Sequence, residues 1–533
     1  MFISDLVTLW LVFIVSWVLV SRGVPVFQEL IRDMTDFFME KALGPGADLF
    51  EGRAGSGPVA WMLHGMLWTC IGATFTFISM WVGHEPDAIA SLDGIGYSPS
   101  ASQLSVAATL AAEGGIMMLL IGAGLHINGR LSGPGLASDT NAILTSYGYG
   151  TGLLMGFVAA HMNSSIGDNL GTISDVVLVT TILGVIANHL LTLGNRTSDQ
   201  IQPSQWLIVF GLSLPLLMCA VCYVVGVNDA IHESLEVLPM LASALAVAYY
   251  VVPKESGVPL WSRALAGATV MLTFVTISPI GVSAAEGALS SGDASVLTIF
   301  FAASLIPLMA AAMNVFQTAR SNWSAASNSP GTTSVMLGMF LLVASAAGSL
   351  FTASDAHSAG DITHMQAPLE SLFLWGAMGM IALGGAITCF PAASGRALHS
   401  NQTSRTVMWM FAGGATIAFL LSMSAAMTHA AMAEVITAND ELELLDMSAV
   451  NDLNTLSSIA FYAVAIGAIF MMLNMIRGHF SGSIIGTSSP SGLTAPRMAL
   501  TPGTTTIRQL LAAGAGIDTE IDVISDAEAD EEE

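Results

Sequence analysis

Residues 235–279 read LEVLPMLASALAVAYYVVPKESGVPLWSRALAGATVMLTFVTISP, and this stretch decides the fold of the chain. It holds two long apolar runs, the first of which ends in YYVVPK at 249–254. A short polar turn at 255–257 follows, and Ser262 and Arg263 begin the second run. Two such runs joined by a short basic turn predict a helical hairpin in a membrane, with its positive charges at one face.

The composition of the whole chain agrees with a membrane protein. Of its 533 residues, 53% are hydrophobic and only 10% are charged, and the mean hydropathy is +0.69. Soluble domains carry about 25% charged residues, so the composition predicts many membrane-spanning helices. The net charge is −25, and many of the acidic residues lie in 518–533, which predicts a disordered acidic tail. The sequence has no basic patch, which argues against nucleic acid as a partner.

Thirteen apolar segments are long enough to be read as membrane spans. The first, 6–20, lacks the basic start of a signal peptide, so we expect a retained transmembrane helix, with cleavage as the alternative. Residues 26–43 alternate apolar and charged residues at helical spacing, which is typical of an interfacial amphipathic helix. The twelve further segments are 58–82, 104–125, 143–162, 173–193, 205–227, 233–252, 263–284, 295–316, 333–353, 369–390, 407–431 and 456–476.

The basic residues give an independent test of this number of spans. If the N-terminus lies outside and the loops alternate, every Lys and Arg falls on one side of the membrane. Short cytoplasmic loops gather Lys and Arg, so the pattern predicts an outside N-terminus and a cytoplasmic C-terminus. These fourteen residues are Arg22, Arg32, Lys41, Arg53, Arg130, Arg196, Lys254, Arg263, Arg320, Arg396, Arg405, Arg477, Arg497 and Arg508.

The hairpin resembles the sixth and seventh core helices of subunit I of the haem–copper oxidases. It is most similar to the cbb3-type cytochrome c oxidase, with nitric oxide reductase as a cousin. The resemblance covers 58 to about 476 and implies a fold of twelve core helices, to which 6–20 would add one. Similar motifs follow in the same order at Trp68–Gly72, Ala112–Gly115, Asn128–Arg130, Tyr147–Tyr149, Pro203–Trp206, Ala312–Asn314 and Gly384–Pro391.

This resemblance suggests three parts in an all-α polytopic membrane protein. Residues 1–57 would hold the N-terminal transmembrane helix and the amphipathic helix. Residues 58–480 would form the twelve-helix oxidase-like core, and 481–533 the disordered acidic cytoplasmic tail.

The family's chemistry implies six histidines, which hold two haems and a copper or iron beside one of them. Neutral imidazole suits these metals because it binds them without adding charge inside the bilayer. The expected places can be counted from Gly114, Pro253, Pro279 and Pro391. They are occupied by Ser105, Glu233, Ile280, Gly281, Glu370 and Leu372.

Two histidines are the remaining candidates for binding a cofactor. His232 is next to Glu233 and would serve only if the register slips by one residue. His64 matches no family ligand, and a core or interfacial role is the alternative to haem binding. We therefore expect no metal and no cofactor, whereas a retained family function would require haem b and copper.

Acidic residues inside predicted spans are functional candidates of a different kind. An ionisable side chain in a membrane costs several kcal/mol unless it is paired or hydrated. The candidates for proton or cation binding are Glu113, Glu233, Glu236 and Glu370. Hydrated side chains at the outer interface are the alternative interpretation.

Three functions remain open on the sequence. The first is a haem-free relative of the oxidase subunit, with a structural or accessory role among the membrane subunits of a respiratory complex. The second is an active terminal oxidase or nitric oxide reductase with rebuilt ligands, and the third is a proton or cation transporter. We expect the plasma membrane of a prokaryote, and an acidic outer face that can receive a basic partner.

Overall fold

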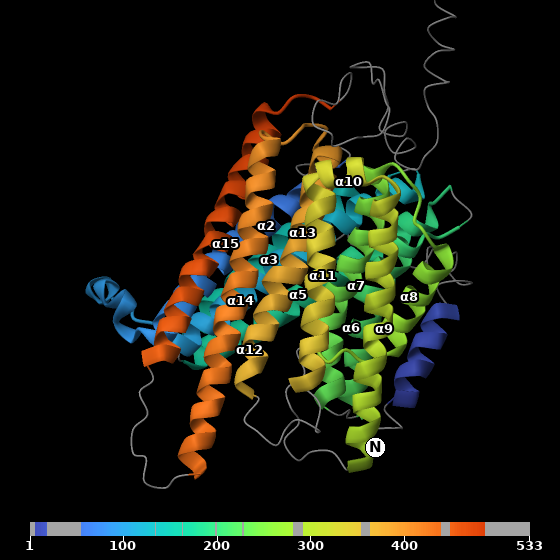
Figure 1. Cartoon of the computed structure of the whole chain (residues 1–533). Helices are drawn as coiled ribbons and strands as arrows, with labels where there is room; N and C mark the ends of the chain where they lie inside the picture. Colours follow the sequence, from blue (N-terminus) through green and yellow to red (C-terminus); the bar gives the residue numbers. More distant parts are fainter. Residues whose placement is uncertain are drawn as a thin grey trace, which may run out of the picture.

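The chain folds as a bundle of long helices, shown in Figure 1. The computed structural model describes residues 6–18, 55–133, 135–162, 164–197, 200–225, 229–280, 291–352, 363–438 and 448–485. Besides Leu6–Val18, its helices are α2 (Ser56–His84), η3 (Pro86–Ile95), α3 (Ala101–Ser132), α4 (Asp139–Ala160), α5 (Ser165–Gly194), α6 (Pro203–Val225), α7 (Asp229–Ser256), α8 (Arg263–Val275), α9 (Ser291–Ser321), α10 (Trp323–Asn328), α11 (Pro330–Thr352), α12 (Thr363–Ser371), η5 (Leu372–Met378), α13 (Gly379–Ser394), α14 (Asn401–Ala438) and α15 (Ser448–Ser481). Within the described ranges there is no strand, only a single β-bridge between Arg396 and Ile484.

The number of apolar helices agrees with the number of predicted spans. In the part of the chain that the structure describes, eleven helices are long and apolar enough to cross a membrane, and the shorter helices Leu6–Val18 and Arg263–Val275 bring the total to thirteen. The prediction of an all-α polytopic membrane protein is therefore confirmed for the described residues. The expected amphipathic helix at 26–43 and nearly all of the expected tail lie outside the described residues.

The N-terminal helix packs against the core through aromatic side chains. The indole Nε1 of Trp10 donates a hydrogen bond to the carbonyl oxygen of Val275 at 3.1 Å. The ring of Phe13 lies 5.8 Å from that of Phe274. Trp17 stacks on Trp206 with 4.5 Å between the ring centroids. Such ring pairs contribute about 0.5–1.5 kcal/mol beyond their buried area, so this helix belongs to the packed structure.

The hairpin that decides the fold consists of α7 and α8, and its second helix is shorter than predicted. The Tyr249 hydroxyl donates to the Thr269 hydroxyl at 2.9 Å and joins the two helices. The prediction of a helix over 263–284 is wrong at its end, because α8 stops at Val275. Thr276 is already extended, and Pro279 disfavours helical geometry in the residue before it.

A buried asparagine fixes the start of α8. The amide of Asn314, on α9, accepts a hydrogen bond from the backbone N–H of Ser262 at 3.0 Å. It also donates to the carbonyl oxygen of Ser262 at 2.9 Å. The Ser262 hydroxyl caps α8 by accepting from the N–H of Leu265. One side chain therefore satisfies both backbone groups of the capping residue, where water is scarce.

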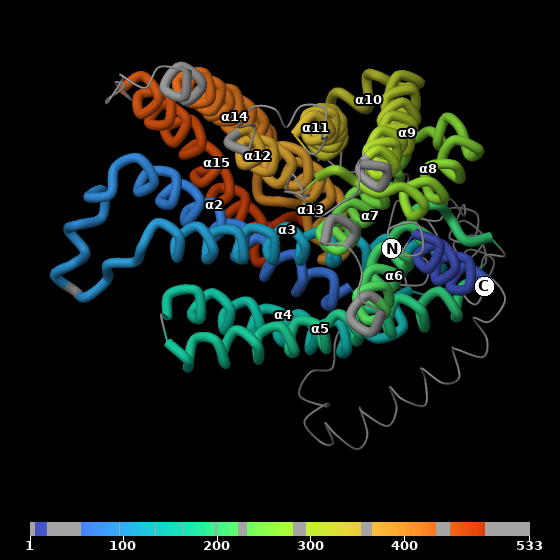
Figure 2. The backbone as a smooth tube through the Cα atoms, turned by 90° about the horizontal axis from the view of Figure 1, so that it is seen from below, coloured from blue at the N-terminus to red at the C-terminus, as the bar shows by residue number. Residues whose placement is uncertain are grey.

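The same arrangement, which we call the asparagine clamp, occurs at two other helix pairs. Asn188 of α5 holds both backbone groups of Ser138, which caps α4. Asn474 of α15 holds both backbone groups of Ser400, which precedes α14. Figure 2 shows the α4–α5 and α14–α15 pairs as separate parts of the bundle. The three clamps therefore fix the start of a helix in the same way in three parts of the fold.

Candidate functional site

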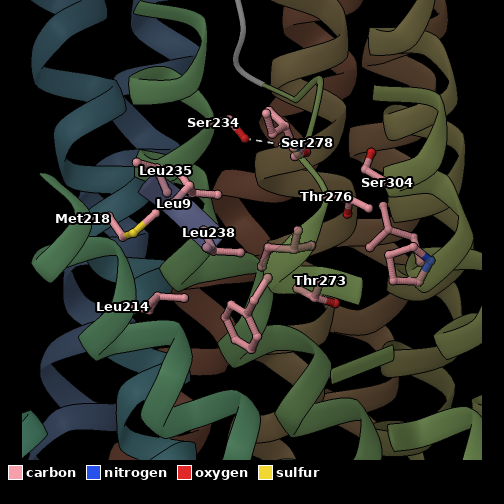
Figure 3. A pocket seen from close by; sticks show the side chains of 15 residues that line it. Leu9, Leu214, Met218, Ser234, Leu235, Leu238, Thr273, Thr276, Ser278 and Ser304 are labelled. Carbon is pink, nitrogen blue, oxygen red and sulfur yellow. Dashed lines mark hydrogen bonds between the residues drawn. The ribbon is translucent and has the colours of Figure 1, made fainter. Parts of the chain in front are cut away.

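Two contrasting regions lie at or near positions where the family resemblance implies histidines. The first, which we call the packed region, lies among α6, α7, α8 and α9 and is shown in Figure 3. It encloses a cavity of only about 30 Å³, which is enough for one or two water molecules. The side chains that fill it include Leu214, Met218, Leu235, Leu238, Phe274 and Ile277.

The family resemblance also implies histidine ligands at positions near the packed region. In the described residues these positions carry an apolar side chain or a side chain that does not meet this region. Ile280 is 1% exposed, and its backbone N–H donates to the Ser278 hydroxyl at 3.2 Å. The N–H of Ser278 in turn donates to the Ser234 hydroxyl at 3.0 Å. The side chain of α7 that meets this segment is therefore Ser234, rather than Glu233 or His232. Gly281 lies outside the described residues.

The expected His-x-His position on the tenth core helix coincides with a π-helical turn. The π-helix η5 begins at Leu372, whose side chain is 2% exposed. Glu370, two residues earlier, is exposed and accepts a hydrogen bond from the Gln366 amide at 2.7 Å. Single π turns are frequent at functional sites in helices, and they rotate the residues that follow by a fraction of a turn.

The second region is an open cavity of about 410 Å³, which we call the five-helix cavity. Ser105, one of the expected ligand positions, lines it from α3, and Ser371 lines it from α12. Ser371 lies between Glu370 and Leu372, so two of the positions counted from the resemblance lie in or next to the wall of this cavity. The lining comes from α2, α3, α12, α14 and α15 and comprises Thr76, Ser79, Met80, Ser105, Ala108, Thr109, Ala367, Pro368, Ser371, Ser422, Ala425, Ala426, His429, Val450 and Asn454.

Neither histidine candidate from the sequence lies in the cavity wall. His64 faces α4, where its Nδ1 lies 3.3 Å from the Ser146 hydroxyl and its ring meets Tyr147. It is twelve residues before Thr76 on α2, or about 18 Å along the helix. His232 is half exposed, and its Nδ1 lies 3.4 Å from a carboxylate oxygen of Glu236.

The four glutamates come closer together than their sequence positions suggest. Glu113 lies within electrostatic range of Glu236 and Glu370. Glu370 lies within range of Glu233 as well. Glu113 is also one turn along α3 from Thr109, which lines the five-helix cavity. The structure therefore brings these carboxylates from α3, α7 and α12 into one neighbourhood.

His429 was not weighed as a site residue in the sequence, although it is the one histidine in the cavity wall. It lies on α14 near the far end of a long apolar helix. The signal that could have found it is an imidazole inside a predicted span, since ionisable groups there are functional candidates.

A buried polar cluster at the far end of α7 was also missed. Glu255 is 6% exposed, and one of its carboxylate oxygens accepts from the Ser329 hydroxyl at 3.2 Å. Lys254 lies 5.4 Å above the ring of Tyr250, which meets the imidazole of His126. The motif at 249–254 was interpreted as the end of a helix and as part of the family resemblance, and its contribution to this cluster was not predicted.

The described residues do not fit a haem–copper centre. Ser105, Glu370, Leu372 and Ile280 offer no imidazole at the expected positions. No group of three or more His, Cys, Asp or Glu side chains in the described ranges has an arrangement that could hold a metal ion. No reaction step can therefore be assigned to such a centre in this chain.

Comparison with known proteins identifies the fold. No protein-family model and no curated protein matches the sequence. A solved structure of a heme-copper terminal oxidase dimer, determined by cryo-EM, is similar with a TM-score of 0.56 and 12% sequence identity. The match covers 87% of this chain and 91% of that chain. At this identity the likeness concerns the fold alone, and the chain is a multi-pass membrane protein with a distant haem–copper-oxidase-like fold.

Proposed function

We propose that this protein is a haem-free, non-catalytic relative of the oxidase large subunit, with a structural or accessory role in a respiratory-type membrane complex. The observation that carries the proposal is the packed region. Leucine, isoleucine and phenylalanine side chains fill it, and Ile280 is buried beside it. A buried imidazole without a metal would be costly there, so these substitutions suit a core without redox centres.

The decisive experiment is a pyridine haemochrome assay with metal analysis on the purified protein. We expect no stoichiometric haem, copper or iron. Stoichiometric haem together with copper or iron would overturn the proposal and favour the alternative of an active oxidase or nitric oxide reductase with rebuilt ligands.

The neighbourhood of four glutamates supports a second candidate function, proton or cation transport. Like charges close together in a membrane raise one another's free energy, which favours binding of a proton or a cation. Ion flux into liposomes that contain the protein tests this candidate. Transport requires that Glu113→Gln lowers the flux, while Asp93→Asn, at an exposed position in η3, leaves it unchanged.

We further propose that the membrane is the plasma membrane of a prokaryote, with the N-terminus outside. The one-sided distribution of Lys and Arg supports this orientation. Single cysteines at Asp93 and Asp446 should react with an impermeant reagent in intact cells, and one at Ala515 should not. Reaction of the cysteine at Ala515 would reverse the assignment.

The acidic outer loops support the proposal of a basic partner at that face. In the assigned orientation these loops contain many carboxylates and no Lys or Arg. The negative field would speed the approach of a basic protein at low ionic strength. If added salt does not weaken binding of basic candidate proteins, electrostatic attraction is not the cause.

A further inference from the structure

The five-helix cavity is built differently from an ordinary gap between membrane helices. Its volume of about 410 Å³ falls in the range of small-molecule sites, which is about 300–1,000 Å³. Ser105 and Thr109, on adjacent turns of α3, both line it and are exposed. The two side chains therefore face open space within a membrane-spanning helix.

Several polar side chains in the wall lack a partner within the described part of the protein. On α2, Thr69 and Thr74 donate to backbone oxygens one turn earlier, at 2.7 and 2.8 Å. Thr76 and Ser79 on the same helix make no such bond in the described structure. The same holds for the side chains of Ser105, Thr109, Ser371 and Asn454. None of these hydroxyl and amide groups is among the buried unsatisfied polar groups of the described residues, so they are accessible from the cavity and free to hydrogen-bond a group that enters it.

The charges of the wall restrict what that partner can be. Among the described residues, no Lys, Arg, Asp or Glu lines the cavity, and His429 is the one titratable side chain that does. The exposed carboxylate of Glu370 lies next to the wall residue Ser371 and would repel an anionic head group. Hydroxyl and amide donors suit an uncharged group with oxygen acceptors. The remaining surface, from Ala108, Ala425 and other small apolar residues, suits an apolar body.

We propose that the five-helix cavity binds an uncharged amphiphile whose head carries carbonyl or hydroxyl oxygens. Thr109 and Asn454 lie in walls formed by different helices, so they can contact the head from two sides. Two sources offer this chemistry, namely a membrane quinone and the glycerol-ester region of a phospholipid. The proposal goes beyond the haem-free scaffold, because it assigns a ligand to the space that the scaffold leaves open.

The test uses the full-length protein in nanodiscs with two photoactivatable probes, an azido-quinone and a diazirine phosphatidylcholine. Labelled peptides are mapped by mass spectrometry. Ser105→Trp fills the cavity, and Val106→Trp is the matched control because Val106 is 58% exposed and does not line it. We expect labelling of the cavity-lining segments to fall about tenfold in Ser105→Trp and to persist in Val106→Trp.

A second variant addresses the head group without changing the shape of the wall. Thr109→Val keeps the size of the side chain and removes its hydroxyl, so we expect labelling to fall about fivefold. Helix content and elution volume are compared with the wild type for each variant. Asn454→Leu provides the same readout from the opposite wall and should act in the same direction.

The outcomes separate the possibilities. Preferential labelling by the quinone probe identifies a free quinone as the ligand, and preferential labelling by the lipid probe identifies the bilayer. Equal labelling of the wild type and Ser105→Trp overturns the proposal, as does labelling confined to other segments. The haemochrome assay reads out separately, so failure of the haem-free proposal and failure of this one are distinguishable.

Discussion

The packed region and the five-helix cavity are two spaces between helices of the same bundle, and they differ in how their side chains fill them. In the packed region, apolar side chains close the space to about 30 Å³. In the five-helix cavity, serine, threonine and alanine leave about 410 Å³. The first arrangement stabilises the fold directly, whereas the second preserves a polar space. The difference indicates that only one of the two places has become part of the hydrophobic core.

The sizes of the two spaces decide what each can contain. An empty apolar cavity destabilises by about 24 cal/mol per Å³ in one well-studied series. On that scale the packed region loses less than about 1 kcal/mol. The five-helix cavity is open and partly polar, so this scale for enclosed apolar voids does not apply to it, and water, lipid or a ligand can fill it.

The largest expected contrast comes from truncating one side chain in each wall. Phe274 is 2% exposed and contacts the rings of Phe13 and Phe210. Phe274→Ala should destabilise the protein by about 3–5 kcal/mol, because it opens a void that the surroundings cannot close. Met80→Ala, in the half-buried wall of the five-helix cavity, should cost about 1 kcal/mol or less. Retention of the monodisperse peak after heating measures both, and equal losses would contradict the contrast.

Introducing a histidine at one position in each part of the molecule tests the same difference between the packed region and the five-helix cavity. Ile280→His places an imidazole at a position that is 1% exposed, so a loss of about 2–4 kcal/mol is expected. Ser105→His adds an imidazole to a polar cavity with room for it, and should change stability by about 0.5 kcal/mol or less. The two variants are compared by their midpoints of thermal aggregation. Tolerance of Ile280→His would show that the packed region is more adaptable than its small cavity suggests.

Variants of the asparagine clamps test whether the same kind of clamp contributes equally to stability in the helices of the two regions. Asn314 holds the start of α8, whose other end lines the packed region, and Asn474 holds the start of α14, a helix of the cavity wall. Either change to Ala leaves two backbone groups without their partner, and should cost about 2 kcal/mol. Similar losses are expected because the two clamps have the same geometry. A much smaller loss of stability in Asn474→Ala than in Asn314→Ala would mean that the two clamps do not contribute equally to the fold.

The sequence predicted the parts of the fold that depend on local pattern. Apolar runs and one-sided basic residues were sufficient for the number of spans, because both follow directly from the bilayer. Residues 235–279 also led to the oxidase-like fold, which the similar solved structure supports. Counting from Gly114 singled out Ser105 as an expected ligand position, and Ser105 lies in a cavity wall.

The sequence could not predict features that depend on distant contacts. The clamp of Ser262 by Asn314 joins residues 52 positions apart, and no local pattern indicates it. The π turn at Leu372 changes the helical register, which a count based on regular helices ignores. The volume of the five-helix cavity depends on five helices packing together, so it follows from tertiary structure alone.

The smallest expected contrast concerns a single hydroxyl group in each region. The Thr273 hydroxyl donates to the carbonyl oxygen of Thr269 at 2.8 Å, and the side chain is 5% exposed in the packed region. Thr273→Val should therefore lower stability by about 1 kcal/mol. The Thr109 hydroxyl faces the five-helix cavity and makes no hydrogen bond to the described protein, so Thr109→Val should change stability by about 0.5 kcal/mol or less. Thermal midpoints measured in the same nanodisc lipid give both values. A loss in Thr109→Val as large as that in Thr273→Val would mean that the Thr109 hydroxyl supports the fold, and that the five-helix cavity is less open to a ligand than its wall indicates.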